Sequence, residues 1–309
     1  MPTTSTFRHT VPDGTVLHVR SWLPEGPPRA VVQVVHGMVE HAERYAHLGE
    51  RLADQGYAVY AADHRGHGRT AGGPGELGHL GDEHGFAAVV DDTVALTDHL
   101  SAEHPGAPVV LLGHSMGSFL ARAYAARHGD RLAGLILSGT AGDPGLSGRL
   151  GLKVATLEAR LRGPRARSRL MEALLLGPYN RAFRPNRTRF DWLSRDEAQV
   201  DSYAADELCG GTATAGFYRD LLTGLLWVSE PSTYARIPAG LPVLVVGGEV
   251  DPVGGAAAAE EVSGRLRRAG VRDVTVTVWP GARHEVLNEV NRDEVEADLL
   301  SWLDARFPR

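Results

Sequence analysis

The sequence predicts an α/β fold in which helices flank a mostly parallel central sheet. Six short runs, almost wholly apolar and rich in β-branched residues, are typical of strands buried on both faces. These runs are residues 30–35, 57–62, 108–112, 132–137, 241–246 and 274–278. Segments with helical periodicity occupy residues 86–104, 119–128, 256–269 and 292–307. Because strands and helices alternate along the chain, we expect a parallel sheet wrapped by helices.

An alternating segment precedes the first buried run. Val16, His18, Arg20 and Trp22 mark its period of two within residues 15–22. This period is typical of a strand, and its place before the first buried run suits an antiparallel partner. We therefore expect an early antiparallel hairpin at the edge of the sheet.

The alternation of strands and helices stops in the middle of the chain. Residues 143–236 contain no run that resembles a strand, and Gly and Pro are frequent at both margins, residues 139–148 and 231–242. Such a segment is typical of an insertion joined by two hinges. We expect a helical cap subdomain at residues 143–236 and a core domain made of residues 1–142 and 237–309.

Composition narrows the class of protein. At 309 residues and 43% hydrophobic, the chain can fill a sizeable core, and a net charge of −6 argues against a general nucleic-acid binder. The one cysteine, Cys209, cannot form an intramolecular disulfide or a Cys/His zinc site. No apolar run approaches the roughly 20 residues of a membrane span, and residues 1–14 are polar, unlike a signal peptide. We therefore expect a cytoplasmic protein.

Gly113, Ser115 and Gly117 form a GxSxG motif between a predicted strand and a predicted helix. This setting is that of a nucleophile elbow, in which the serine occupies a strained turn. Side chains at the two glycines would collide where strand and helix meet. The helix N-terminus also favours negative charge at the serine. We take Ser115 as the candidate nucleophile, and the alternative is a Gly-rich turn capped by a serine.

A serine nucleophile needs a base and an acid. His284 follows the last predicted strand, and it is the only one of 14 histidines there. It is our candidate general base. The imidazole needs a carboxylate to hold its tautomer. Asp251, after the run at residues 241–246, is the first candidate, and Asp143, after the preceding run, is the alternative. The order Ser, Asp, His matches the α/β-hydrolase fold.

Acyl transfer also needs two backbone donors directed at the oxyanion. The first candidate is the N–H of Met116, directly after the nucleophile. The second is the N–H of Met38, in the loop after residues 30–35. We expect no cofactor and no metal, since the nearby histidines are spread over two loops without a metal-binding motif. Those histidines are His36, His41, His47, His64 and His67.

These motifs together resemble a known family, the α/β-hydrolases of the monoacylglycerol lipase and lysophospholipase type, which are also grouped with serine aminopeptidases. The resemblance spans nearly the whole chain. It rests on HGMVEHAERY at residues 36–45, DHRGHG at 63–68, the GxSxG motif, GEVD at 248–251, FDWLSRD at 190–196 and His284. In that family the first segment bears an oxyanion-hole donor and the second is a structural turn.

The resemblance implies a cap over the site and hydrolysis of an ester that carries one fatty acyl chain, such as monoacylglycerol or lysophospholipid, through an acyl-enzyme on Ser115. A serine at the elbow disfavours epoxide hydrolases and haloalkane dehalogenases, which carry aspartate there. The absence of an HGGG segment disfavours the hormone-sensitive lipase branch. The alternatives are a serine aminopeptidase, a general small-ester esterase, and a non-catalytic relative that uses the pocket as a receptor.

The expected cap has a distinctive helix. Leu150, Val154, Leu157 and Leu161 recur on one helical face, whereas Arg149, Lys153, Arg160 and Arg162 are expected largely off it. Residues 149–189 carry eleven basic and two acidic side chains. Leu150, Val154, Leu157 and Val253 are candidate substrate contacts. The apolar face either packs on the core or rests peripherally on an anionic inner-membrane surface, with Arg165, Arg167 and Arg169 contributing.

Overall fold

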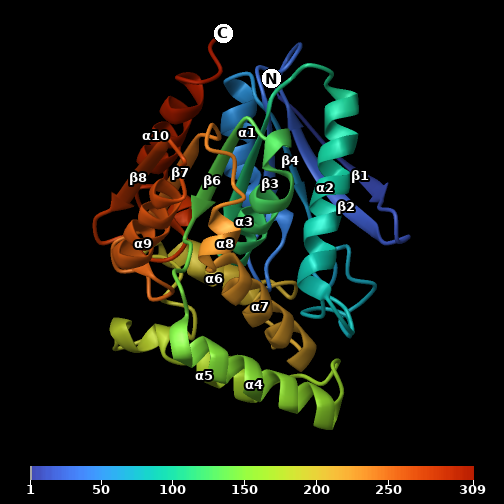
Figure 1. The fold of residues 1–309 in the computed structure, drawn as a ribbon, viewed down its shortest axis with the longest axis vertical. Helices are drawn as coiled ribbons and strands as arrows, with labels where there is room; N and C mark the ends of the chain where they lie inside the picture. The colour runs from blue at the N-terminus through green and yellow to red at the C-terminus, as the bar shows by residue number, and fades with distance from the viewer. Residues whose placement is uncertain (1) are drawn as a thin grey trace.

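An eight-stranded sheet runs through the middle of the molecule in the computed structural model, which describes residues 2–309 (Figure 1). Its strand order is β1-β2-β4-β3-β5-β6-β7-β8. The strands are β1 (Thr3–Thr10), β2 (Val16–Leu23), β3 (Val31–Val35), β4 (Ala58–Ala62), β5 (Val109–His114), β6 (Gly134–Ser138), β7 (Val243–Gly248) and β8 (Val274–Trp279). All six apolar runs are therefore confirmed as strands. The antiparallel edge hairpin is confirmed as β1 and β2.

The sheet is parallel from β4 to β8, and β2 alone pairs antiparallel with it, through β4. Successive residues of a strand point to opposite faces, so the nearly continuous apolar runs supply two hydrophobic layers. Val31 and Leu111 belong to one buried cluster, and Val32 and Leu112 to the other. The mostly parallel sheet that the sequence predicts is thus confirmed.

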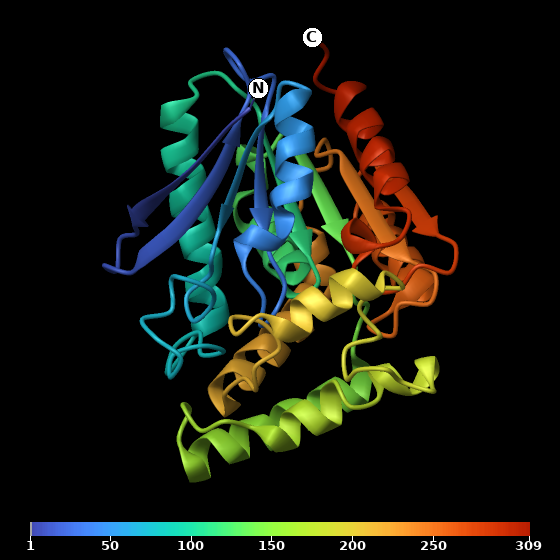
Figure 2. The same cartoon turned by 180° about the vertical axis from the view of Figure 1, so that it is seen from behind.

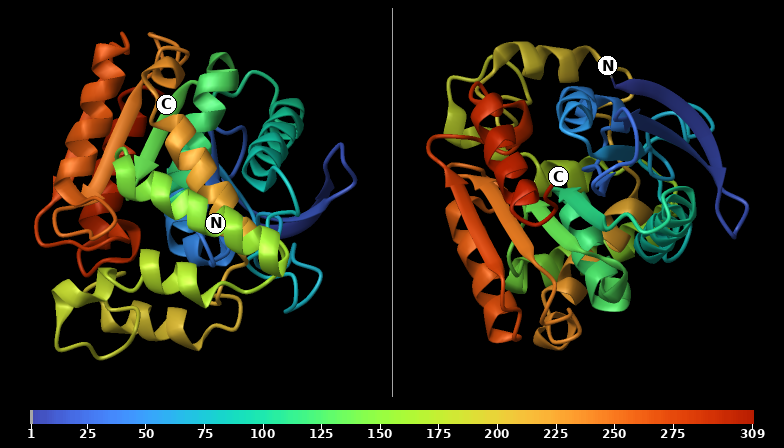
Figure 3. Two further views of the ribbon diagram at one scale, coloured as in Figure 1. Left: turned by 60° about the horizontal axis from the view of Figure 1, so that its bottom comes forward. Right: turned by 90° about the horizontal axis from the view of Figure 1, so that it is seen from above.

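Helices cover both faces of the sheet. The first face carries α2 (Gly85–Glu103), α3 (Met116–His128) and α9 (Gly255–Arg268), whose apolar residues share one cluster with the sheet. The second face carries α1 (Ala46–Asp54) and α10 (Arg292–Asp304). Seen from above, the two groups of helices lie on opposite sides of the strands (Figure 3, right).

The chain between β6 and β7 forms helices and loops. Its helices are α4 (Gly145–Arg162), α5 (Arg169–Leu175), α6 (Glu197–Ala205), α7 (Ala215–Val228) and α8 (Pro231–Tyr234). Helix α7 packs against α2 and α3, and Phe217 and Leu221 of α7 join the hydrophobic cluster of the sheet. Helices α4 and α5 form the outermost layer, beyond α6 and α7 (Figure 2). The division into a core and a cap at residues 143–236 stays a prediction.

The parallel strands end at the edge of the sheet that faces this helical segment (Figures 1 and 3). In an open α/β sheet, ligands bind beyond the carboxyl ends of the strands. The loops that follow β3, β5, β6, β7 and β8 therefore meet at one edge. These loops contain Met38, Ser115, Asp143, Asp251 and His284.

Candidate active site

Ser115 lies in the turn that joins β5 to α3. Its backbone adopts φ 52° and ψ −120°, a conformation that side-chain-bearing residues rarely adopt. The Ser115 N–H donates to the Ser138 carbonyl oxygen at 2.9 Å, so the adjacent strand β6 holds the turn in place. Helix α3 begins at Met116, directly after the serine. The predicted strand, sharp turn and helix therefore stand in the structure as the sequence motif requires.

The two glycines of the motif are fixed by space. A Cβ atom at Gly113 would lie 2.3 Å from the Gly117 carbonyl oxygen, and one at Gly117 would lie 1.9 Å from the Val35 carbonyl oxygen. Both distances are far shorter than van der Waals contact. The turn can therefore form only where both positions lack side chains, as the sequence analysis expected.

His284 and Asp251 form a buried pair. His284 Nδ1 lies 2.9 Å from Asp251 Oδ2, and the side chains are 2% and 1% exposed. The second carboxylate oxygen accepts from Val253 N–H at 2.8 Å, which fixes the orientation of the carboxyl group. With a proton on Nδ1 donated to Asp251, Nε2 is the ring nitrogen left to accept a proton.

Asp143, the alternative acid, has other partners. Its Oδ2 accepts from Arg265 Nη2 at 3.2 Å, and its Oδ1 accepts from Gly145 N–H at 2.9 Å. Its side chain is 34% exposed and lies beside α9. The structure thus brings Asp251 to His284 and leaves Asp143 in a surface ion pair.

Electrostatics at His284 favour its protonated form. Complete burial lowers the pKa of an imidazole, yet the pKa of His284 is raised above its ordinary value because Asp251, and then Glu285 and Glu40, lie close by. Its neighbour His114, with ring centroids 4.9 Å apart, has its pKa lowered to about 4 by burial and by His284 itself. Of these two imidazoles, that of His284 is therefore the one suited to accept a proton.

The backbone N–H of Met38 belongs to a residue that lines the same site as Ser115. Among residues 2–309, it has no hydrogen-bond acceptor in the protein. The N–H of Met116 belongs to the first residue of α3, where helical amides have no intrahelical acceptor. Gly37 carries Met38 close to the nucleophile, since a Cβ at Gly37 would lie 3.3 Å from Ser115 Cβ. Met38 and Met116, the residues predicted to supply the oxyanion donors, therefore both lie beside Ser115.

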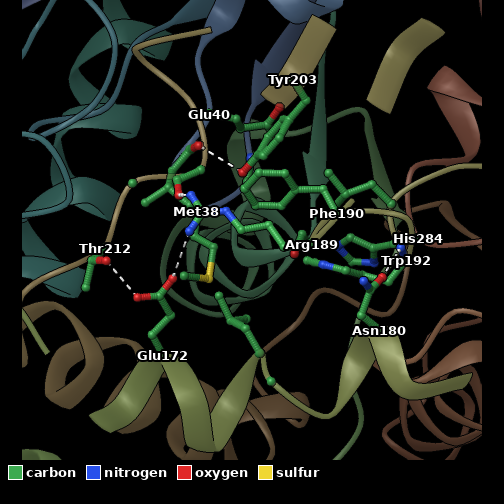
Figure 4. A pocket seen from close by; sticks show the side chains of 18 of the residues that line it. Met38, Glu40, Glu172, Asn180, Arg189, Phe190, Trp192, Tyr203, Thr212 and His284 are labelled. Carbon is green, nitrogen blue, oxygen red and sulfur yellow. Dashed lines mark hydrogen bonds and ion pairs between the residues drawn. The ribbon is translucent and has the colours of Figure 1, made fainter. Parts of the chain in front are cut away.

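Two cavities meet at Ser115. The first, of about 550 Å³, contains charged and polar groups, and we call it the polar cavity (Figure 4). The second, of about 710 Å³, is lined largely by apolar side chains, and we call it the apolar cavity. Ser115, Met38, Leu176 and Trp192 line both cavities. A molecule bound at Ser115 therefore has an apolar space on one side and a polar space on the other.

The polar cavity holds several ion pairs and hydrogen bonds. Glu172 accepts from Thr212 Oγ1 at 2.6 Å and lies 3.8 Å from Arg189 Nη1. Asn180 and the ring of Trp192 complete its wall, and this ring lies 5.0 Å from that of His284. Figure 4 shows these side chains pointing toward one another around the cavity. No role was predicted for Trp192 from the sequence, although the segment FDWLSRD contains it.

The predicted substrate contacts divide into two groups. Leu150, Val154 and Val253 line the apolar cavity. Leu157 does not line it, and its side chain is 57% exposed. Seven residues after Leu150, Leu157 returns to nearly the same helical face but lies about 10 Å further along the axis. Leu157 therefore lies on the same face of α4 as Leu150 but about two turns beyond the cavity, and the structure does not bring it to the site.

Within residues 2–309, two groups of side chains have possible metal-ligating atoms within 4.8 Å of one another. One contains His41, Asp206 and Cys209, and the other contains His47, Asp293 and Glu296. In each group the histidine lies within 3.0 Å of a carboxylate oxygen, so an ion pair already accounts for the approach. Neither group includes Ser115, Asp251 or His284.

A parallel sheet with this strand order, a serine on a strand-to-helix elbow and a buried His–Asp pair at the same edge define an α/β-hydrolase. The comparisons agree. A model of the family described as "Serine aminopeptidase, S33" matches residues 26–291. The chain belongs to this family, and it is a serine hydrolase.

The chain is similar to several characterised proteins. It is 35% identical over 286 residues to a monoacylglycerol lipase of Mycolicibacterium smegmatis, covering 91% of this chain and 90% of that one. A thermostable carboxyl esterase from Bacillus coagulans in complex with glycerol has a TM-score of 0.91 and 30% identity, with 99% of both chains covered. A structure described as a lipase in its open form has a TM-score of 0.89 and 31% identity, with 99% and 100% covered.

Proposed function

We propose that this protein hydrolyses esters of single-acyl-chain lipids, monoacylglycerol or lysophospholipid, through an acyl-enzyme on Ser115. His284 Nε2 takes the proton of Ser115 Oγ as the oxygen attacks the ester carbonyl carbon. Asp251 holds the Nδ1 proton and stabilises the imidazolium. The N–H groups of Met38 and Met116 stabilise the oxyanion of the tetrahedral intermediate.

The remaining steps use the same groups. As the intermediate collapses, the bond from the carbonyl carbon to the alcohol oxygen breaks, and His284 gives its proton to the departing alcohol. A water molecule then donates a proton to His284 Nε2 and attacks the acyl-enzyme. The second intermediate releases a fatty acid, and the proton returns to Ser115 Oγ.

One observation carries the proposed substrate class: Ser115 lies where an apolar and a polar cavity meet. The apolar cavity suits one fatty acyl chain, since its walls include Phe119, Leu221 and Leu225. The polar cavity suits a hydroxyl-rich or phosphate-bearing alcohol, because Glu172, Asn180 and Arg189 offer hydrogen-bond partners. The relative from Mycolicibacterium smegmatis, named a monoacylglycerol lipase, supports the same class.

An aminopeptidase would need a carboxylate for the substrate α-ammonium group. Of the described residues, the carboxylates that line the polar cavity are Glu40, Glu172 and Glu285. Arg44 pairs with Glu40 and Glu285, and Arg189 lies 3.8 Å from Glu172. Because each carboxylate already has an arginine, the site favours an ester over a peptide with a free amino end.

A substrate panel tests the proposal. Purified protein receives equal amounts of monoacylglycerol, lysophospholipid, a short nitrophenyl ester and an aminoacyl amide. We expect the first two to be preferred. Ser115→Ala should lower kcat by about 10⁶-fold, because only binding and the oxyanion hole remain. An active-site-directed phosphonate should label the wild type and not the variant. Retention of more than a few per cent of the rate in Ser115→Ala, free of contaminating esterase, would refute the proposal.

The outer face of α4 and α5 supports a second proposal, contact with a membrane. Leu146, Leu150, Leu157 and Leu161 fall within a sector of about 60° on α4. Ala155 and other buried residues of α4 lie on the opposite side. With Leu170 and Leu174 of α5, these leucines are 51–76% exposed, and we call the six the leucine surface. These leucines therefore do not pack on the core, although α4 itself packs against α7 through its opposite side.

Basic side chains border the leucine surface. Arg149, Lys153 and Arg160 occupy the adjacent sector of about 40° on α4, beside the leucines and off their face, as the sequence predicts. Arg165 and Arg167 are engaged elsewhere: Arg165 pairs with Glu76 and Asp82, and Arg167 donates to carbonyl oxygens of residues 74–77. They are therefore poorly placed to contact lipid, contrary to the sequence interpretation.

We propose that the leucine surface rests on an anionic membrane and delivers single-chain lipid to Ser115. Leu150 and Leu174 belong to the leucine surface and also line the apolar cavity, so the cavity opens where lipid would be met. Exposed leucines beside basic residues are typical of interfacial helices. No helix within residues 2–309 is long and apolar enough to cross a bilayer, so the proposed contact is peripheral.

A further inference from the structure

A buried ion-pair cluster connects two loops of the active site. Arg44 Nη1 and Nη2 donate to the two carboxylate oxygens of Glu285, both at 2.6 Å. Arg44 Nη1 also donates to Glu40 Oε2 at 2.8 Å. The three side chains are 10% exposed or less. Buried, bidentate arginine–carboxylate pairs fix geometry in two directions and are stronger than surface pairs.

Glu40 fixes the segment that bears Met38. Its Oε1 accepts from the Gly37 N–H at 2.5 Å and from the Tyr45 hydroxyl at 2.9 Å. The Gly37 amide is one residue before Met38, whose own N–H is the proposed oxyanion donor. The carboxylate of Glu40 therefore sets the direction of the backbone that leads into the oxyanion hole.

Glu285 fixes the segment that bears His284. Its N–H donates to the Leu193 carbonyl oxygen at 2.8 Å, and its Oε2 accepts from Asn288 Nδ2 at 3.1 Å. It directly follows His284 in the chain. A displacement of the Glu285 side chain would therefore shift the imidazole relative to the nucleophile.

The sheet alone does not set the distance between these two segments. The Met38 segment follows β3, and the His284 segment follows β8. Three strands, β5, β6 and β7, lie between β3 and β8 in the sheet order. The side chain of Arg44 spans this separation directly, since it contacts Glu40 of the first segment and Glu285 of the second.

We infer that Glu40, Arg44 and Glu285 form a positioning cluster. This cluster holds the oxyanion segment and the His284 segment at the relative position that catalysis requires. The inference rests on the proposed function, because it takes the roles of Met38, Ser115 and His284 from it. None of the three is proposed to touch the reacting atoms. They act through the backbone of Gly37 and Met38 and through the placement of the imidazole.

The cluster also has an electrostatic effect on His284. Two buried carboxylates share one guanidinium, which leaves a net negative charge beside the imidazole. Both Glu285 and Glu40 contribute to the raised pKa of His284. Arg44 in turn lowers the pKa of the Glu285 carboxyl to about 2 although burial opposes this, so Glu285 stays ionised throughout the working range. A neutral residue at position 285 should therefore lower the pKa of His284.

Two conservative variants test the inference. Glu285→Gln keeps the shape and removes the charge, and Arg44→Lys keeps the charge and removes the bidentate geometry. On a short nitrophenyl ester, we expect each to lower kcat by about 10²-fold, as small misplacements of reacting groups do, with a much smaller change in KM. In Glu285→Gln the acid limb of the pH profile of kcat/KM should also move to lower pH, because a negative charge beside His284 is lost. In Arg44→Lys, which keeps the charges, this limb should stay in place.

Arg65→Lys is the matched control. Arg65 makes a similar bidentate pair with Asp92, at 2.7 and 2.6 Å, and neither residue lines the polar or the apolar cavity. This variant should lower the melting temperature and leave kcat and the pH limb unchanged. If the positioning cluster had only a structural role, Glu285→Gln and Arg44→Lys would also lower the melting temperature and leave kcat and the pH limb unchanged. That result would overturn the inference.

Phosphonate labelling of Ser115 distinguishes a failure of this inference from a failure of the proposed function. Wild type that is labelled at Ser115, together with folded Glu285→Gln and Arg44→Lys that keep wild-type kcat, would overturn the inference and leave the proposed function standing. Wild type that is not labelled would overturn both. If Glu285→Gln fails to fold, Arg44→Lys and Glu40→Gln decide under the same readouts, and wild-type kcat in both would refute the positioning role.

Discussion

At the scale of single residues, the active site depends on a strained backbone at Ser115. A φ of 52° in a residue with a side chain costs about 1–3 kcal/mol, and the surrounding structure must offset this cost. The hydrogen bond to Ser138 and the close approach permitted by Gly113 and Gly117 provide the restraint. Because the elbow is local, the five-residue motif together with the strand before it and the helix after it was enough to predict it.

Other parts of the site are not local. Arg44 and Glu285 are separated by 241 positions, so no spacing rule relates them. Both lie next to residues that the motifs identify: Arg44 is within the segment HGMVEHAERY, and Glu285 follows His284. The pairing depends on how the loops after β3 and β8 converge, and this follows from the complete strand order rather than from any single segment.

The identity of the acid gives a prediction at the same scale. Asp251→Asn should lower kcat by about 10⁴-fold, because an amide no longer fixes the imidazole tautomer or stabilises the imidazolium. Asp143→Asn serves as the control, since its partner is Arg265, and we expect nearly wild-type kcat. Both variants are assayed side by side on the nitrophenyl ester. The opposite ranking would assign the acid role to Asp143.

At the scale of secondary structure, the sequence predicts elements better than their surroundings. The six apolar runs and the four helical segments are confirmed. Most of their predicted ends lie within three residues of the ends in the structure. The period of α4 was also predicted, but not which side of it faces solvent. Periodicity shows that leucines share a face. Whether that face is buried depends on what packs against it, and here α7 covers the side with Ala155 and Ala159.

The leucine surface gives a prediction for α4. The inactive Ser115→Ala protein should sediment with vesicles of anionic phospholipid, and less so as ionic strength rises, because the basic border is screened. Leu157→Ser with Leu161→Ser should weaken binding, since both side chains are exposed and neither lines the apolar cavity. Arg149→Gln, Lys153→Gln and Arg160→Gln together should reproduce the loss at low salt.

Activity measurements complete this test. In the wild-type background, hydrolysis of substrate embedded in anionic vesicles should fall steeply with salt, whereas hydrolysis of a short soluble ester should stay nearly flat. Arg165→Gln with Arg167→Gln is the control, because these arginines hold residues 74–82 and should affect stability instead. Equal salt sensitivity for both substrates, or no sedimentation with vesicles, would show that α4 serves only to cover the site.

At the scale of the whole molecule, burial of histidines connects the active site to stability. His36, His64 and His67 pack together below the oxyanion segment, with the rings of His36 and His64 stacked at 3.8 Å. All three are buried, and so is His114 beside His284. Burial lowers the pKa of each, to about 3 for His64 and to about 4 for His114. The folded protein therefore keeps these four imidazoles neutral.

This burial predicts that stability falls in mild acid. In the unfolded chain a histidine titrates near its ordinary pKa of about 6.5, so below that pH the unfolded state binds protons that the folded state does not. The free energy of unfolding should therefore decrease as pH falls from about 6.5 toward the lowered folded-state values, by about 2 kcal/mol at pH 5 for each of His64 and His114. His284, whose pKa is raised, opposes this trend.

Urea unfolding between pH 8 and 5 measures how the free energy of unfolding changes with pH. His67→Gln should reduce this pH dependence, because His67 is buried with no partner for Nε2 among residues 2–309. A free energy of unfolding that stays constant over this range would mean that these imidazoles are not held neutral by the fold.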